Sequence, residues 1–165
     1  MSALLAVDVG LRTGLALFGD DGRIRWARSQ NLGVISRLRR AAPAILDQAP
    51  DVVWLVLEGG GALVDIWQRE GQRRQIAVRI VSAEEWRSDL LYARQQRSGE
   101  QAKQHAEVLA RRVIAWSGCS QPKTLRHDAA EAILVGLWRA GQLGWTATPQ
   151  QIAGEQCWCA MTPGC

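Results

Sequence analysis

The chain opens with an apolar stretch, Leu4–Phe18, that is interrupted by one aspartate and by two glycines. This pattern predicts a strand ending near Asp8, a tight turn over Gly10–Thr13 and a second strand over Gly14–Phe18. Polar and apolar residues alternate over Arg23–Ser29, which predicts a third, half-exposed strand. Three such strands in succession would form an antiparallel meander.

Two further strands and several helices follow. The apolar run Val52–Leu57 is nearly continuous, which is typical of a central, commonly parallel strand covered on both faces. A shorter strand is expected at Ile76–Val81. Apolar residues at helical spacing predict helices in most of the remaining chain. These helices are Leu32–Ala49, where Pro43 would introduce a kink or a break, Ala62–Gln75, a brief helix opened by the capping-box pattern Ser82–Glu85, Glu100–Ser117 and His127–Leu143.

Two segments lack any periodic pattern. Tyr92–Gly99 is polar and basic, and we expect it to be an exposed loop. After Gly144 the apolar pattern fades, so we expect one domain over residues 1–144 and a flexible tail over residues 145–165.

Composition narrows the class of protein. The chain has 165 residues, of which 47% are apolar and 22% charged, as in an ordinary globular domain. Its start lacks a basic segment and no apolar run has membrane-spanning length, so we expect a cytoplasmic protein without a membrane partner. The net charge is +4, and nearly all the cations are arginines. This excess indicates either a nucleic-acid partner or codon bias in a GC-rich genome.

The predicted strands carry two acidic residues that need an explanation. Asp8 follows four apolar residues, and a carboxylate in such a strand is costly to bury unless it is paired or binds a metal. Glu58 ends the strand Val52–Leu57 and precedes Gly59–Gly61, at the position where open α/β sheets place their sites. Alternatively, Glu58 is the first solvated residue after the strand.

The last predicted helix begins with two more acids. Asp128 and Glu131 are three residues apart, so they share one face of the first turn. They fit a helix cap as well as a functional pair. The small residues Ala129, Ala130 and Ala132 would let this turn approach a sheet closely.

These acidic positions converge in principle on one place. Clustered carboxylates repel one another and need cations, and ligand sets made only of oxygen select Mg²⁺ or Mn²⁺. Two such ions about 4 Å apart clamp the attacking and leaving oxygens of a phosphodiester displacement. Water is then the nucleophile, and the sequence shows no Ser/His/Asp or Cys/His arrangement that would replace it.

The sequence resembles a known family, the RuvC-type Holliday-junction resolvases and their compact phage relatives. The segments that carry the resemblance are Leu4–Phe18 (LLAVDVGLRTGLALF), Val52–Gly59 (VVWLVLEG), Val81–Arg87 (VSAEEWR), Ser98–Arg112 (SGEQAKQHAEVLARR) and His127–Gly136 (HDAAEAILVG). The resemblance implies a ribonuclease-H-like α/β fold, with a mixed five-stranded sheet flanked by helices. It also implies four metal ligands for two Mg²⁺ or Mn²⁺ ions: Asp8, Glu58, Asp128 and Glu131.

The resemblance further implies how such a protein would act on DNA. Lys103 matches a lysine that lies near the DNA backbone at the active site of the family. The family works as a homodimer that nicks opposing strands of a four-way DNA junction symmetrically. The region after the fourth strand contacts the junction centre in the family, and its candidates here are Trp67, Arg69, Arg73 and Arg74. No wedge phenylalanine follows Glu58.

Three other classes of protein share parts of this pattern. The opening Asp8–Gly14 also resembles the YqgF-like branch of the same fold, which acts on ribosomal RNA precursors, although that branch usually lacks a counterpart of Glu58. The sugar-kinase and actin fold opens similarly but needs two such domains. An inactive nucleic-acid-binding module would keep the fold, but four acids buried without metal would destabilise it.

Overall fold

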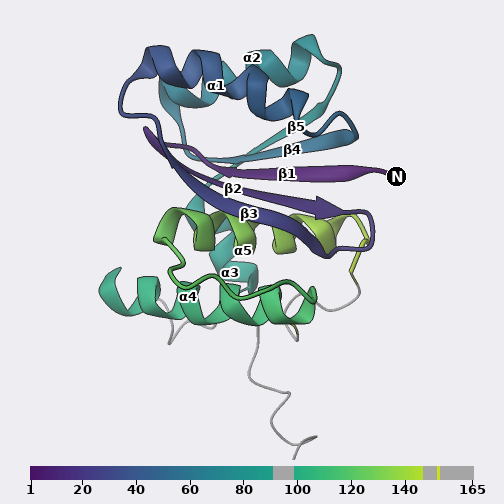
Figure 1. The fold of residues 1–165 in the computed structure, drawn as a ribbon, viewed down its shortest axis with the longest axis vertical. Coiled ribbons are helices and arrows are strands. Elements are labelled where there is room, and N and C mark those ends of the chain that lie inside the picture. Colours follow the sequence, from purple (N-terminus) through teal and green to yellow (C-terminus); the bar gives the residue numbers. More distant parts are fainter. Residues whose placement is uncertain (91–98, 147–151, 153–165) are drawn as a thin grey trace, which may run out of the picture.

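The centre of the protein is one mixed five-stranded sheet (Figure 1). The computed structural model describes residues 1–90, 99–146 and 152, and leaves the side chains of residues 99–103 undescribed. The strands are β1 (Ala3–Asp8), β2 (Arg12–Gly19), β3 (Ile24–Asn31), β4 (Val52–Glu58) and β5 (Ala77–Val81), in the spatial order β3-β2-β1-β4-β5. β1, β2 and β3 pair antiparallel, and β1, β4 and β5 pair parallel. The predicted meander and parallel strands are confirmed.

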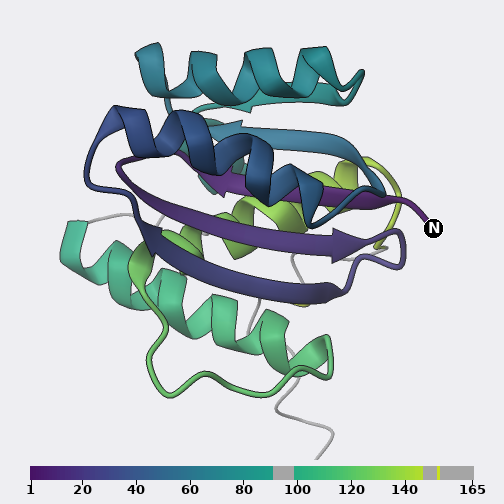
Figure 2. The same ribbon diagram turned by 45° about the horizontal axis from the view of Figure 1, so that its top comes forward.

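Helices cover both faces of the sheet. They are α1 (Ile35–Asp47), α2 (Gly61–Arg73), α3 (Ala83–Leu90), α4 (Gly99–Trp116) and α5 (His127–Gln142). Figures 1 and 2 show α1 and α2 on one face, with α3, α4 and α5 on the other. α5 lies directly on the sheet, and α4 packs on the outside of α5.

The strand alternation divides the apolar side chains into two cores. In β1, Leu4 and Ala6 belong to the core under α5, whereas Leu5 and Val7 belong to the core under α1 and α2. All four are fully buried. This double coverage explains why the central strands are apolar without a break, and it leaves Asp8 on the α5 side, two residues beyond Ala6.

Two glycines allow α5 to approach the sheet closely. A Cβ atom on Gly14 of β2 would lie 1.8 Å from the backbone oxygen of Asp128. A Cβ atom on Gly136 of α5 would lie 2.2 Å from the ring of Phe18. Each glycine is therefore required for packing, one at each end of the contact between α5 and β2.

The first helix is shorter than the sequence predicts. The predicted helix begins at Leu32, but the backbone N–H of Leu32 donates to the Leu11 oxygen at 2.7 Å, and Gly33 adopts a φ of 72°. Leu32 and Gly33 therefore belong to the connection that follows β3, and α1 begins at Ile35. Pro43 lies inside one continuous helix and does not divide it.

Two predicted segments fall largely outside the described residues. The predicted loop Tyr92–Gly99 does so except for Gly99, and the predicted tail does so except for Trp145, Thr146 and Ile152. Trp145 and Ile152 are partly buried against the core under α5. Within the described part of the chain, no helix is long and apolar enough to span a membrane.

Candidate metal centre

The candidate site begins with a row of residues that crosses the sheet at one level. Asp8 of β1 is in register with Glu58 of β4 on one side and with Gly14 of β2 on the other. Gly14 is in turn in register with Ser29 of β3. Residues in register on neighbouring strands point to the same face, and this row faces α5.

The first turn of α5 brings two more carboxylates over this row. The backbone of Asp128 rests against Gly14, because Gly14 has no side chain to hold it off. Glu131 follows three residues later on the same side of the helix. Glu58 and Asp128 are each 8% exposed and Glu131 is 3% exposed, so the acids lie in a largely dry environment.

The acids act on one another electrostatically. Burial raises the pKa of Asp8 to about 8, and the nearby carboxylates of Glu58, Glu131 and Asp128 add to the rise. Burial also raises the pKa of Glu58 to about 7, with Glu131 as the next cause. The structure therefore places Glu58, Asp128 and Glu131 near enough to Asp8 to affect it electrostatically.

Two of the acids have polar partners outside the acidic cluster. The Arg87 Nη2 of α3 lies 2.8 Å from both carboxylate oxygens of Glu131. The His127 Nε2 lies 3.4 Å from Oε1 of the same residue. The Ser29 hydroxyl donates to Asp128 Oδ2 at 2.5 Å. Arg87 thus supplies positive charge directly beside the acids and lowers the pKa of both Asp8 and Glu58.

The donor set fits a divalent cation in its chemistry. All four acids offer oxygen, as Mg²⁺ and Mn²⁺ require. Among the described residues, the buried Oε2 of Glu58 has no hydrogen-bond partner, and a cation would satisfy such an oxygen. No three His, Cys, Asp or Glu side chains of the described chain are already close enough together to hold a metal ion. Metal binding would therefore require the acids to move closer, and Glu131 to share or leave Arg87.

The structure corrects one predicted nucleic-acid contact. Trp67 is fully buried in the core under α1 and α2, so the prediction that it contacts nucleic acid is wrong. Val64 and Gly71 are buried on the same face of α2, so the helical spacing alone places Trp67 on the core side.

The predicted arginines lie on the same helix as Trp67, on the far face of the sheet from α5. The helix α2 has 13 residues and spans about 20 Å. Arg73 and Arg74 lie at the end of α2 that is farther from Glu58. Arg74 binds Glu70, Asp47 and the Pro43 oxygen, and so holds α1 against α2. The structure does not bring these two arginines to the acids.

Two further predicted residues remain predictions. Arg69 is exposed on α2. Lys103 belongs to α4, and its side chain is among those left undescribed.

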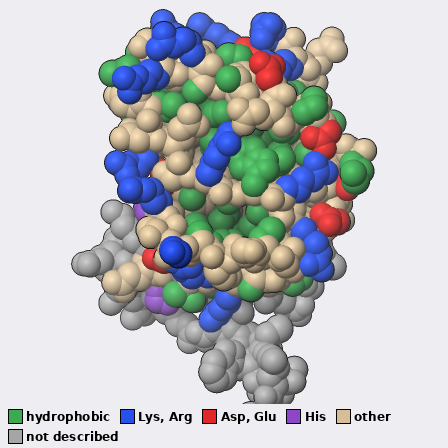
Figure 3. Space-filling model, in the orientation of Figure 1, with side chains coloured by type: hydrophobic (Ala, Val, Ile, Leu, Met, Phe, Trp, Pro, Cys, Tyr) green, Lys and Arg blue, Asp and Glu red, His purple; other side chains and the backbone are tan. Residues whose placement is uncertain are grey.

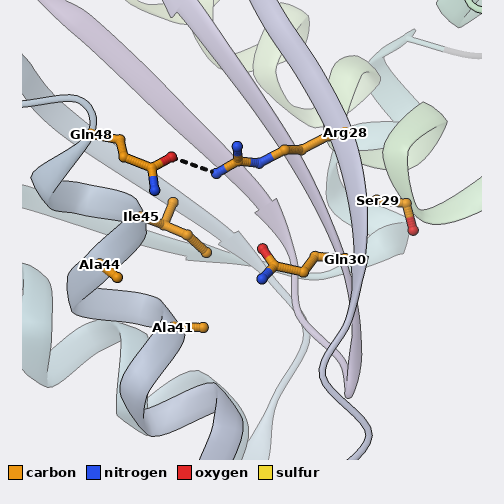
Figure 4. A pocket seen from close by; sticks show the side chains of 7 residues that line it. All are labelled: Arg28, Ser29, Gln30, Ala41, Ala44, Ile45 and Gln48. Atoms are coloured by element: carbon orange, nitrogen blue, oxygen red, sulfur yellow. Dashed lines mark hydrogen bonds between the residues drawn. The ribbon is translucent and has the colours of Figure 1, made fainter.

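One surface hollow, of about 210 Å³, borders Asp128, because Ser29, Arg126 and Ala129 are among its lining residues. Another, of about 270 Å³, is enclosed by β3 and α1, and its lining comprises Arg28, Ser29, Gln30, Ala41, Ala44, Ile45 and Gln48. Figure 4 shows Arg28 and Gln30 pointing toward α1, whereas the Ser29 side chain points away from it. Figure 3 shows basic side chains spread over the face drawn, many of them at the top, rather than gathered in one patch. Charge on that face therefore does not single out a nucleic-acid surface.

Comparison with known proteins identifies the fold. No protein-family model and no curated protein matches the sequence. Among solved structures, T. thermophilus RuvC in complex with Holliday junction substrate matches with a TM-score of 0.61. The match covers 87% of this chain and 96% of that one at 9% identity. The fold is ribonuclease-H-like.

The sequence does not single out three residues beside these acids: Arg87 bonds Glu131, Ser29 bonds Asp128, and the Trp86 indole N–H lowers the pKa of Glu58. Arg87 and Trp86 come from the brief helix α3 and Ser29 comes from the half-exposed strand β3, and neither element carries one of the four acids. The sequence gives one signal for Arg87, which is a basic residue in a segment that resembles the resolvases. A serine on a half-exposed strand gives no such signal, because solvent is its usual partner.

Proposed function

We propose that this protein is a metal-dependent endonuclease that cleaves branched DNA, with the four-way junction as its substrate. The observation that supports this most is the placement of Asp8 and Glu58 in register beneath Asp128 and Glu131 of α5. The likeness to a resolvase structure establishes the fold, and the proposed activity goes beyond that likeness.

In this proposal, Asp8 and Glu58 hold the cation from the sheet, and Asp128 and Glu131 complete the ligand set from α5. Two bound divalent cations would supply a nucleophilic water and neutralise charge on the phosphodiester, leaving a 5′-phosphate and a 3′-hydroxyl. Arg87 is half-buried beside these acids and is placed to pair with a phosphate oxygen. We also propose that Lys103 stabilises charge on the scissile phosphate.

The symmetry of a four-way junction suggests two sites acting together. We propose that the protein works as a homodimer in the cytoplasm and nicks two opposing strands. A molar mass of twice 18.2 kDa, measured by light scattering at working concentration, would support the dimer.

The proposal is tested by nicking of a labelled four-way junction beside a matching duplex, with Mg²⁺ or Mn²⁺. Wild-type protein should make paired nicks in the junction alone. Glu58→Gln should abolish nicking while binding persists, and the control Glu84→Gln, at an exposed position of α3, should not. Cleavage of structured RNA and not of the junction would instead favour the RNA-processing class.

A second function is supported by a specific observation. Arg87 already neutralises Glu131 through hydrogen bonds to both of its carboxylate oxygens. An inactive nucleic-acid-binding module could use such an internal cation in place of a metal. Junction binding without cleavage under either metal, in the same assay, would favour this module.

A further inference from the structure

The strand β3 and the helix α3 contribute none of the four proposed ligands, yet each lies against one of them. The Ser29 side chain faces α5 because Ser29 is in register with Gly14, on which Asp128 rests. Its hydroxyl lies 2.5 Å from Asp128 Oδ2, and Asp128 Oδ1 accepts from the Ala129 N–H at 3.1 Å. Both oxygens of Asp128 are thereby oriented.

The second contact joins α3 to Glu58. Trp86 is fully buried, and neither its indole Nε1 nor Glu58 Oε2 has a hydrogen-bond partner among the described residues. The two side chains are close enough for the indole N–H of Trp86 to lower the pKa of Glu58. An unpaired buried polar group destabilises the fold, so a small shift that joins this donor to this acceptor would be favourable.

We propose that Ser29 and Trp86 are positioning residues of the metal centre: Ser29 orients Asp128, and the Trp86 indole N–H donates to Oε2 of Glu58. This inference rests on the proposed function, because it assumes that both acids bind a cation. Carboxylates that repel one another turn apart when nothing restrains them. Hydrogen-bond partners outside the cluster keep the free lone pairs of the carboxylates directed at the cation. The loss of such partners in metal sites typically lowers the metal affinity about 10–100-fold.

The two roles are tested separately in the full-length protein with conservative variants. Ser29→Ala removes the hydroxyl, and Ser29→Thr restores one. Trp86→Phe removes the indole N–H but keeps an aromatic face for Arg87, whose guanidinium lies 5.1 Å from the Trp86 ring. Mn²⁺ affinity is measured by calorimetry, and urea unfolding with chelator present reports the fold.

Each variant has a matched control elsewhere in the molecule. Ser117→Ala also removes a hydroxyl that bonds to β3, since Ser117 Oγ accepts from the Ile24 N–H at 3.0 Å. Trp67→Phe removes another fully buried indole whose Nε1 has no partner within the described chain, but on the opposite face of the sheet. A purely structural role would affect variant and control alike.

We expect Ser29→Ala and Trp86→Phe each to weaken Mn²⁺ binding about 10-fold or more, with wild-type affinity in both controls and in Ser29→Thr. A folded variant that binds Mn²⁺ as tightly as its control would overturn the positioning role of that residue. Wild-type protein that binds no Mn²⁺ would contradict the proposed function itself, and the positioning roles with it.

Discussion

Asp8 should make the protein less stable as the pH rises, as long as no metal is bound. Burial and the neighbouring acids raise the pKa of Asp8 from 3.8 to about 8. A raised pKa means that the folded protein binds a proton more tightly than the unfolded chain. The stabilisation from that proton is complete below about pH 4 and is lost as the pH rises to about 8. Asp8→Asn removes this dependence, because the amide stays neutral.

The size of the effect follows from the shift in pKa. Each unit is worth about 1.4 kcal/mol, so the full shift has an upper limit of about 6 kcal/mol at pH 8. Asp8 is partly exposed, and the asparagine amide must itself be accommodated among the acids. We therefore expect Asp8→Asn to raise the free energy of unfolding by about 2 kcal/mol at pH 8, and by much less near pH 5.

Urea unfolding of wild-type protein and Asp8→Asn, with chelator at both pH values, measures this difference. The exposed position Asp65 provides the control Asp65→Asn, which should change stability equally at both pH values. If Asp8→Asn raises the free energy of unfolding equally at pH 5 and pH 8, or lowers it at pH 8, Asp8 is not a buried carboxylate that its neighbours repel.

Three further predictions follow from the packing. Gly14→Ala should lower the free energy of unfolding by about 2–4 kcal/mol in urea titrations and impair nicking, because the new Cβ would collide with the Asp128 backbone. Unchanged stability would contradict that contact. Arg74→Ala should cost about 1–2 kcal/mol through the lost bonds to Glu70 and Asp47 but leave nicking intact; a loss of nicking in the folded variant would restore Arg74 as a DNA contact. Saturating Mg²⁺ should raise the melting temperature more at pH 8 than at pH 6, because protons compete for the raised-pKa acids. An equal rise in calorimetric scans at both pH values would count against binding by these acids.

Much of the fold could be predicted because local patterns and tertiary packing agree. The unbroken apolar run of β4 requires cover on both faces, and the structure provides it. The four acids could be selected because carboxylates in apolar surroundings are costly without a partner. Their convergence depends on Gly14, which the sequence presents only as the start of a strand, although its main role is to let α5 approach.

The parts that sequence reasoning missed depend on contacts between distant elements. Arg87 and Glu131 are 44 residues apart, and Ser29 and Asp128 are 99 residues apart, so no local pattern links them. The error at Trp67 has a different origin. Trp67 is a candidate only because it lies in the region after the fourth strand, which contacts the junction centre in the family that the sequence resembles, whereas its helical spacing with Val64 and Gly71 places it toward the core.

Anomalous diffraction from crystals of the wild-type protein grown with Mn²⁺ would show whether these acids form a metal centre. We expect anomalous density between the carboxylates of Asp8 and Glu58, beneath the first turn of α5, and its loss in crystals of Glu58→Gln. Well-ordered crystals that show no anomalous density there, with Glu131 still bound to Arg87, would contradict the metal centre and favour a module neutralised by its own arginine.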